Sequence, residues 1–326
     1  MPGHGTTDQL WNNLNTNHTW LAEDVDLPDD VVLWVLYHPR RHDVTHAQEK
    51  CSAWSHAKKI ILLDQEGWFD GPEFEHDSRI TLYDSVVVDH QQVRTWLYWF
   101  RDVAMVDKFT NLSSECKPWQ NKKCEYMFDS LLGTMWPNKS FVQQKIDQSV
   151  FNDCFLQGTK QPHYMQIDKD WVDGGGYGAA TSRVEYRSGQ QTDIAVFVPS
   201  TIYNNSWYSI VAEAHRSRIY FTEKTAKPMI AKRLFVLFGH QHTLKALKEL
   251  GFRTFDSVID ESYDGIADDT TRWQAAWHQL ELLMQKDPRM IYEQIQTVID
   301  HNYQHITQTN WYDLLVKSIR HELTRD

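Results

Sequence analysis

A short charged segment lies directly before the strongest apolar strand pattern in the sequence. Glu223, Lys224 and Lys227 precede the run 234–238, which Gly239 follows. A carboxylate can accept hydrogen bonds from hydroxyls, and two nearby ammonium groups can meet a diphosphate. This chemistry suits a sugar nucleotide. The alternative is a solvated first helical turn that happens to carry charges, because short charged patterns recur by chance.

Apolar runs of strand length alternate with helix-like segments in the first half of the sequence. Residues 31–37, 59–64 and 80–88 form nearly continuous apolar runs, as in strands that are buried on both faces of a sheet. The segments 44–56 and 91–100 have the composition of short helices. This alternation predicts a parallel α/β sheet.

A second series of elements follows the polar stretch 110–123, which is typical of a loop or linker. We therefore expect two α/β domains, 1–120 and 121–326, with a helical C-terminus. Ligands of open α/β sheets bind beyond the carboxyl ends of the strands, so charged groups there are the candidates for a site. The expected strands of the second series are 126–133, 153–156, 207–213 and 234–238, and its expected helices are 138–148, 243–250, 272–285, 288–305 and 311–323.

Composition excludes some classes of protein. The chain has 326 residues, a formal net charge of −11 and four cysteines without metal-ligand spacing. The acidic balance argues against a general polyanion-binding surface, although a local basic groove stays open. No run approaches the roughly 18 apolar residues that span a bilayer, and no secretory signal pattern is visible. We expect a cytoplasmic protein (in the host cytoplasm if viral) with reduced cysteines, no membrane span and no obligate protein partner.

The charged segment belongs to a longer series of patterns. A strand ends in Glu213, and Thr222 then begins the Thr-Glu-Lys-Thr…Lys-Pro series. This series resembles the donor-binding region of the α1,3-fucosyltransferase-like glycosyltransferases and, more closely, related glycosyltransferase-like proteins of tailed phages and marine viruses. The resemblance covers roughly residues 124–270. The other segments that carry it are 128–133 with 137–139, 250–256 (Leu-Gly-Phe-x-Thr-Phe-Asp) and 260–264 (Asp-Glu-Ser-Tyr-Asp).

The resemblance implies the GT-B architecture, in which two Rossmann-like domains face a cleft and the C-terminal domain holds the donor. Glu223 would then hold ribose or sugar hydroxyls, and Lys224 would meet a phosphate. The co-substrate would be a UDP- or GDP-sugar, with no metal and no permanently bound cofactor. Cationic groups there stabilise the leaving nucleoside diphosphate. The further donor-binding candidates are Glu213, Thr222, Lys227, Arg216 and Arg218.

Inverting transfer to a hydroxyl requires a base that removes its proton, and the resemblance implies a carboxylate of the N-terminal domain without identifying it. Three strand ends offer a base: His38, Asp64 with Glu66, and Asp89 with His90. Glu66 is the first choice. For each of these residues the alternative is an ordinary polar loop position.

Two further patterns bear on the acceptor and on metal binding. Arg40 and Arg41 lie in a basic loop after the first strand, and Trp68 could stack on a ring; a basic loop suits a phosphate-bearing acceptor such as DNA, or is simply solvated. The Asp-x-Asp triplets at 24–26 and 168–170 do not clearly follow a buried strand, so we expect no metal site. The acidic cluster 260–264 either faces the cleft or has a structural role, in which it caps the next helix or ties the C-terminal helices to the sheet.

The sequence therefore predicts a metal-independent glycosyltransferase. A 5-hydroxymethylated pyrimidine in phage DNA is one acceptor, which would make the protein a DNA-modification enzyme, and a glycan or glycolipid is the other. A non-catalytic nucleotide-sugar or nucleic-acid binding module on a transferase fold is the third hypothesis. The sequence does not specify the sugar, the nucleotide, the stereochemical outcome or the oligomeric state.

Overall fold

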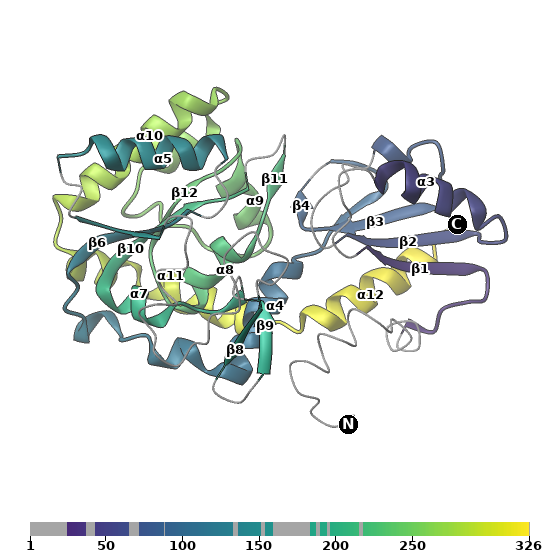
Figure 1. Ribbon diagram of the computed structural model, residues 1–326, viewed down its shortest axis with the longest axis horizontal. Helices are drawn as coiled ribbons and strands as arrows, with labels where there is room; N and C mark the ends of the chain where they lie inside the picture. Colours follow the sequence, from purple (N-terminus) through teal and green to yellow (C-terminus); the bar gives the residue numbers. More distant parts are fainter. Residues whose placement is uncertain are drawn as a thin grey trace. The chain divides into compact units, whose positions relative to one another are not determined.

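The computed structural model describes residues 25–36, 43–64, 72–87, 89–132, 136–150, 154–158, 183–186, 190–193, 196–214 and 218–325. These ranges form a mixed α/β protein with parallel sheets and a helical C-terminus (Figure 1). The chain divides into two compact units, Met1–Arg101 with Asn310–Asp326, and Asp102–Thr309. The division expected at residue 120 falls inside the second unit, and the last helix belongs to the first.

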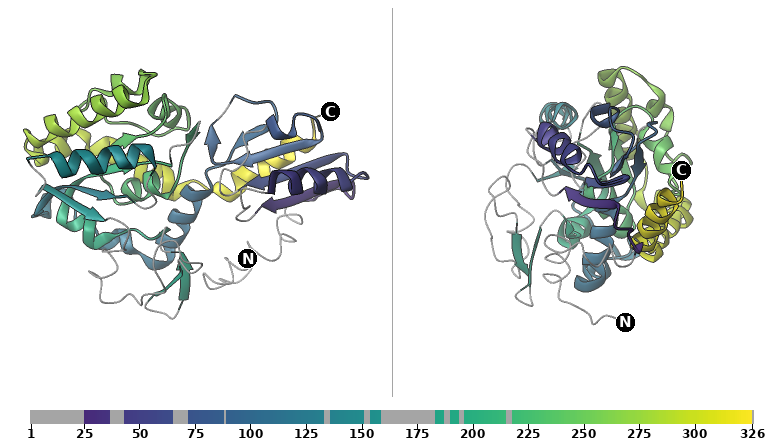
Figure 2. Two further views of the ribbon diagram at one scale, coloured as in Figure 1. Left: turned by 45° about the horizontal axis from the view of Figure 1, so that its top comes forward. Right: turned by 90° about the vertical axis from the view of Figure 1, so that its right-hand side faces the viewer.

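The sheet of the first unit has four parallel strands, and β2 and β3 are its central pair. Both central strands are buried almost throughout, because apolar side chains occupy both of their faces. Helices α3 (Asp43–Ala53) and α12 (Trp311–Leu323) lie on opposite faces of this sheet (Figures 1 and 2). In sheet order the strands are β1 (Val31–Leu36), β2 (Lys59–Asp64), β3 (Ile80–Asp84) and β5 (Val93–Thr95).

The segment 91–100 differs from the helix expected there. Residues 93–95 form the edge strand β5, and helix α4 (Tyr98–Thr110) begins only after it. The amide of Leu82 donates to the carbonyl of Gln92 at 2.7 Å, and the amide of Trp96 donates to that of Asp84 at 2.6 Å. Pairing with β3, together with β-branched residues, outweighs the helical composition of this segment.

Contacts of helix α12 explain why the end of the chain belongs to the first unit. The Tyr83 hydroxyl lies 3.1 Å from Ser318 Oγ. Arg94 pairs with Glu322 at 2.8 Å, where both side chains are largely buried. These two contacts join β3 and β5 to a helix more than two hundred residues later in the sequence.

The sheet of the second unit is also parallel, with its strands in the order β12-β10-β6-β7. Helices α5 and α10 cover one face, and α7, α8 and α11 cover the other (Figure 1). The strands are β6 (Tyr126–Leu131), β7 (Phe155–Gly158), β10 (Ser206–Ala212) and β12 (Phe235–Phe238); the helices are α5 (Pro137–Gln148), α7 (Ser200–Asn205), α8 (Glu223–Ile230), α9 (Thr243–Glu249), α10 (Asp269–Met284) and α11 (Pro288–Gln308). The shorter elements are η2 (Leu112–Glu115) and η3 (Trp119–Asn121), the antiparallel pair β8 (Arg183–Tyr186) and β9 (Gln190–Asp193), β11 (Ile219–Tyr220) and η6 (Glu261–Gly265).

A buried ion pair joins strand β6 to the residue two positions before strand β12 in the second unit. Arg233 is 1% exposed, and its guanidinium pairs with Asp129 on β6 at 2.6 Å. The same guanidinium donates to the hydroxyls of Ser206 and Ser209 and to the carbonyls of Tyr203 and Ser206. Every N–H direction of the guanidinium is therefore used inside the protein, as a buried cation requires.

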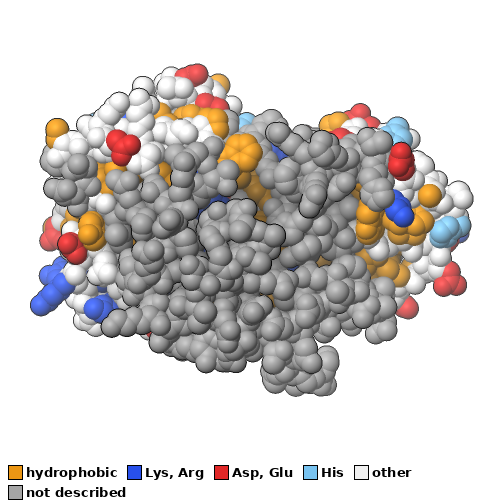
Figure 3. All heavy atoms as spheres, in the orientation of Figure 1, with side chains coloured by type: hydrophobic (Ala, Val, Ile, Leu, Met, Phe, Trp, Pro, Cys, Tyr) orange, Lys and Arg blue, Asp and Glu red, His pale blue; other side chains and the backbone are white. Residues whose placement is uncertain are grey.

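The described surface is mixed in charge. Acidic and basic side chains are interspersed along the outer margins in Figure 3, and the described atoms on that face show no single large patch of one sign. None of the helices in the described ranges combines the length and the apolar character that crossing a bilayer requires.

Candidate functional site

The first turn of helix α8 brings the predicted donor-binding residues together. Thr222 is its N-cap, and its hydroxyl oxygen accepts the Lys224 amide at 3.3 Å. Glu223 is then the first helical residue, and Lys227 follows one turn later on the same side. The N-cap of α8 is hydrogen-bonded to Glu213, which directly follows β10, and β10 and β12 are neighbours in the sheet. The turn therefore lies at the carboxyl edge of a parallel sheet.

Glu213, which directly follows β10, fixes this turn. It is 2% exposed. Its Oε1 accepts the Thr222 amide at 3.1 Å and the Thr225 hydroxyl at 2.5 Å, and its Oε2 accepts the Thr222 hydroxyl at 2.5 Å. These contacts occupy the carboxylate within the protein. Glu213 therefore positions α8, and its donor-binding role stays a prediction.

Glu223 is a buried carboxylate among three lysines. Lys224 Nζ lies 2.6 Å from its Oε1, and the side chain of Lys224 is 20% exposed. Burial by itself raises the pKa of Glu223, but Lys224, Lys227 and Lys139 outweigh burial and hold the pKa below its ordinary value. The carboxylate is therefore ionised at neutral pH. We call this group (Lys139, Glu223, Lys224 and Lys227) the lysine cluster, and the buried carboxylate of Glu213 acts on it as well.

Lys139 is the member of the lysine cluster that sequence reasoning did not select. It lies in the first turn of α5 and is 2% exposed. Burial lowers the pKa of Lys139 to about 7, and the like charge of Lys224 acts in the same direction, while Glu223 and Glu213 oppose it. The available signal was the segment Pro137 to Lys139, which the resemblance included without giving it a role.

The neighbouring Asn138 anchors Lys139 to the sheet. Its side-chain amide donates to the carbonyls of Glu213 at 2.8 Å and Phe238 at 2.7 Å. One amide therefore joins the carboxyl ends of β10 and β12 to the start of α5. This junction explains how residues of two helices meet at one edge of the sheet.

The two remaining predicted donor-binding residues are Arg218 and Arg216. Arg218 is described and is 8% exposed, just before β11. Arg216 lies outside the described residues.

Most acceptor-side predictions fall on residues outside the described ranges. These are His38, Arg40, Arg41, Glu66 and Trp68. Asp89 is described, and it is an exposed residue between β4 (Val86–Val87) and β5. The adjacent His90 lies 3.1 Å from Glu75, where the two side chains form a local surface contact.

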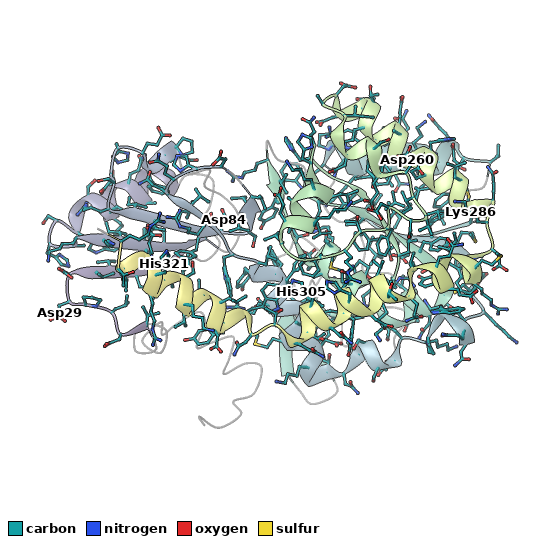
Figure 4. The ribbon with its side chains drawn as sticks, turned by 180° about the vertical axis from the view of Figure 1, so that it is seen from behind. Asp29, Asp84, Asp260, Lys286, His305 and His321 are labelled. Atoms are coloured by element: carbon teal, nitrogen blue, oxygen red, sulfur yellow. The ribbon has the colours of Figure 1, made fainter. Side chains whose placement is uncertain are left out.

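Two aspartates occupy the carboxyl edge of the first sheet. Asp64 ends β2 and Asp84 ends β3, and the two are register partners. Both are buried, at 1% and 0% exposed (Asp84 is labelled in Figure 4). Sequence reasoning noted Asp64 beside Glu66 but overlooked Asp84, because 80–88 looked like one uninterrupted strand. Strand β3 in fact ends at Asp84.

The acidic cluster 260–264 has a structural role. Asp264 Oδ1 and Oδ2 each accept a backbone amide at 3.0 Å, from Leu244 and Lys245 in the first turn of α9. Glu261 accepts the Phe255 amide at 2.7 Å, and Asp260 (labelled in Figure 4) accepts the Ser262 amide at 3.0 Å. The cluster therefore caps the preceding helix α9 and its own turn η6, whereas the next helix, α10, is capped by Asp268.

The fold and the lysine cluster together define a mixed α/β protein with lysines and buried carboxylates at the carboxyl edge of its second sheet. Within the described ranges, no group of three or more His, Cys, Asp or Glu side chains is placed to hold a metal ion. No protein-family model, no curated protein and no solved structure matches the chain.

Proposed function

We propose that this protein is a glycosyltransferase that moves a sugar from a UDP- or GDP-sugar to a hydroxyl acceptor. The observation that carries the proposal is the lysine cluster, in which three lysines surround the buried carboxylate of Glu223. The cluster lies at the carboxyl edge of a parallel sheet, which is where ligands bind in open α/β folds. A GT-B architecture, with the donor half in the second unit and the acceptor half in the first, follows from the same proposal.

Each member of the cluster has a chemical role in this proposal. Lys224, the partly exposed member, meets the diphosphate directly, and Lys139 and Lys227 add positive charge behind it. The N-terminus of α8 contributes the positive end of its dipole. Glu223 accepts hydrogen bonds from ribose or sugar hydroxyls. As the glycosidic bond breaks, this fixed positive charge stabilises the leaving nucleoside diphosphate.

We assign the proton-accepting role to the first unit, where Asp64 and Asp84 adjoin each other at the carboxyl edge of the sheet. Either aspartate offers a carboxylate that can take the proton of the acceptor hydroxyl. Glu66 stays a prediction for the same role.

For the acceptor we propose a 5-hydroxymethylated pyrimidine in phage DNA, with a glycan as the competing candidate. The DNA hypothesis rests on the resemblance to phage proteins and on the basic segment at Arg40 and Arg41. The net charge of −11 favours the glycan. The salt dependence of acceptor binding distinguishes the two candidates, because binding to DNA phosphates weakens steeply as the salt concentration rises.

A donor screen tests the proposal. The melting temperature is measured with UDP- and GDP-sugars, and sugar transfer is measured with hydroxymethylated DNA and with simple glycans. We expect one donor to stabilise the protein by about 2.7 kcal/mol at 100 times its Kd. Glu223→Gln and Lys224→Met should each lose this stabilisation and the transfer.

The matched control is Lys245→Met, which removes a lysine that is 68% exposed on α9. It should keep donor binding and transfer. Unchanged donor binding and transfer in both Glu223→Gln and Lys224→Met would contradict the proposed site. Donor binding without transfer or hydrolysis on any acceptor would instead favour the non-catalytic binding module.

A further inference from the structure

A pocket of about 500 Å³ lies in the second unit, at the other end of helix α8 from the lysine cluster. The pocket is lined by the η2–η3 segment, by the residues at the end of α8 and by helix α11. Glu223 and Ile230 are seven residues apart on α8, which corresponds to about 10 Å along the helix axis. The volume lies within the range of about 300–1,000 Å³ that is usual for small-molecule sites.

A continuous chain of polar contacts runs along one wall of this pocket. Lys232 Nζ donates to Asp300 Oδ1 at 2.8 Å, and Gln296 Nε2 donates to Asp300 Oδ2 at 2.7 Å. Trp119 Nε1 then donates to Gln296 Oε1 at 2.6 Å. Helix α11 supplies both central members four residues apart, so they lie on one face of that helix. The network holds four side chains of three segments in one arrangement.

Aromatic rings lie at both ends of this polar chain. The indole of Trp119 stacks on Tyr292, with ring centroids 6.3 Å apart and an interplanar angle of 17°. At the other end, Lys232 Nζ lies 4.5 Å from the ring centroid of Tyr303. Trp119 and Tyr303 both line the pocket, and both are partly exposed. The pocket therefore offers flat apolar surfaces next to fixed polar groups.

Two of the three lysines in the lining, Lys122 and Lys232, are engaged by groups of the protein, and the third, Lys117, is an exposed residue. Asp300 neutralises Lys232, and both side chains are about 40% exposed. Lys122 directs its ammonium to the buried carbonyls of Tyr203 and Ser206, and burial lowers its pKa to about 7. A carboxylate and an ammonium held side by side match neighbouring hydroxyls, because each hydroxyl can both donate and accept.

We infer that this pocket binds a neutral saccharide of one or two rings. The C–H face of a sugar ring would pack on the indole of Trp119, and its hydroxyls would bond Asp300, Lys232 and Gln296. This site is separate from the lysine cluster and does not depend on the proposed transfer reaction.

Saturation-transfer NMR on the full chain tests the inference. The probes are three neutral disaccharides, namely lactose, cellobiose and N,N′-diacetylchitobiose, with UDP and GDP as anionic competitors. We expect at least one disaccharide to bind. Asp300→Asn and Trp119→Ala should each weaken that binding by about tenfold or more, since each removes one main contact.

Glu293→Gln is the matched control, because Glu293 is an exposed acid on the same helix that does not line the pocket. It should leave the affinity unchanged. Trp119→Ala also removes a ring stack, so Asp300→Asn, which keeps the side-chain shape, decides the result if the alanine variant does not fold. Binding of none of the three disaccharides, or unchanged affinity in Asp300→Asn, would overturn the inference.

The competitors separate this inference from the proposed function. Glu223→Gln should lose binding of the nucleoside diphosphate and keep disaccharide binding. If wild-type protein binds a disaccharide but neither UDP nor GDP, the proposed function fails and the saccharide pocket stands. If UDP or GDP displaces the disaccharide competitively, the two ligands share one site and the separate pocket is wrong.

Discussion

Glu213 accepts both the hydroxyl and the backbone amide of Thr222, at 2.5 Å and 3.1 Å. Because Thr222 is the N-cap of α8, this pair ties the end of a central strand to the start of the helix that carries Glu223. Glu213→Gln exchanges a charged acceptor for a neutral one whose amide faces donors. We expect it to lower the free energy of unfolding by about 1–3 kcal/mol in urea denaturation.

Glu249→Gln serves as the control, since Glu249 is 63% exposed, and it should change stability little. Glu213→Gln should weaken donor binding only through the loss of order in the first turn of α8, so the loss of affinity should accompany the loss of stability. A variant that is as stable as wild type but no longer binds donor would show that Glu213 contacts the ligand, as the sequence predicts.

The affinity for a nucleotide sugar should fall as pH rises through about 7, the pKa of Lys139. Below that pH Lys139 is protonated and adds a cation to the lysine cluster; above it the cation is lost. The diphosphate of a nucleotide sugar does not itself titrate near neutrality. Isothermal titration between about pH 6 and pH 8.5 should therefore show a loss of up to roughly tenfold.

Lys139→Met should bind donor more weakly at low pH and with a flatter pH dependence. Lys245→Met should keep the wild-type profile, because Lys245 is an exposed residue outside the cluster. Identical pH profiles for wild type and Lys139→Met would exclude Lys139 from the donor site.

Removal of Asp129 should be among the most destabilising substitutions in the second unit. Asp129→Ala leaves the guanidinium of Arg233 buried without its carboxylate, which costs about 3–5 kcal/mol in related cases. The double variant Asp129→Ala/Arg233→Met removes the uncompensated charge and should be more stable than Asp129→Ala alone. Urea denaturation of the set measures both effects, and a less stable double variant would contradict this explanation.

Gly239, which ends the strand before α9, has no room for a side chain. A Cβ there would lie 2.7 Å from Leu237 Cδ2 and 3.0 Å from Thr243 Oγ1. Gly239→Ala should therefore cost about 1–3 kcal/mol in thermal or urea unfolding. Gly265→Ala is the matched control, since a Cβ at Gly265 would have no heavy atom within 4 Å. Equal stability of the two variants would show that the strand end relaxes without cost.

The regular elements were largely predictable because their apolar patterns are local. The strand expected at 59–64 is Lys59–Asp64, and that expected at 234–238 is Phe235–Phe238. The helices expected at 138–148 and 311–323 are Pro137–Gln148 and Trp311–Leu323. In each case the apolar pattern that predicts the element lies within the residues of that element.

The roles of individual polar residues were less predictable because they depend on partners distant in the sequence. Glu213 resembled a ligand-binding acid at a strand end, but Thr222 and Thr225 occupy its carboxylate. Lys139 joins the lysine cluster only because α5 begins beside α8, and no pattern around Lys139 specifies that neighbour. Asp84 is a candidate because it is the register partner of Asp64, and the lengths of the strands do not predict this register.

The amide of Asn138 has a consequence for the energetics of any anion that meets the lysine cluster. It joins two strand ends through the carbonyls of Glu213 and Phe238, and the next residue is Lys139. Lys139 therefore extends from a helical turn that is bonded directly to two strand ends. A ligand would meet charge that is already in place, so little conformational entropy remains to be lost from the protein on binding.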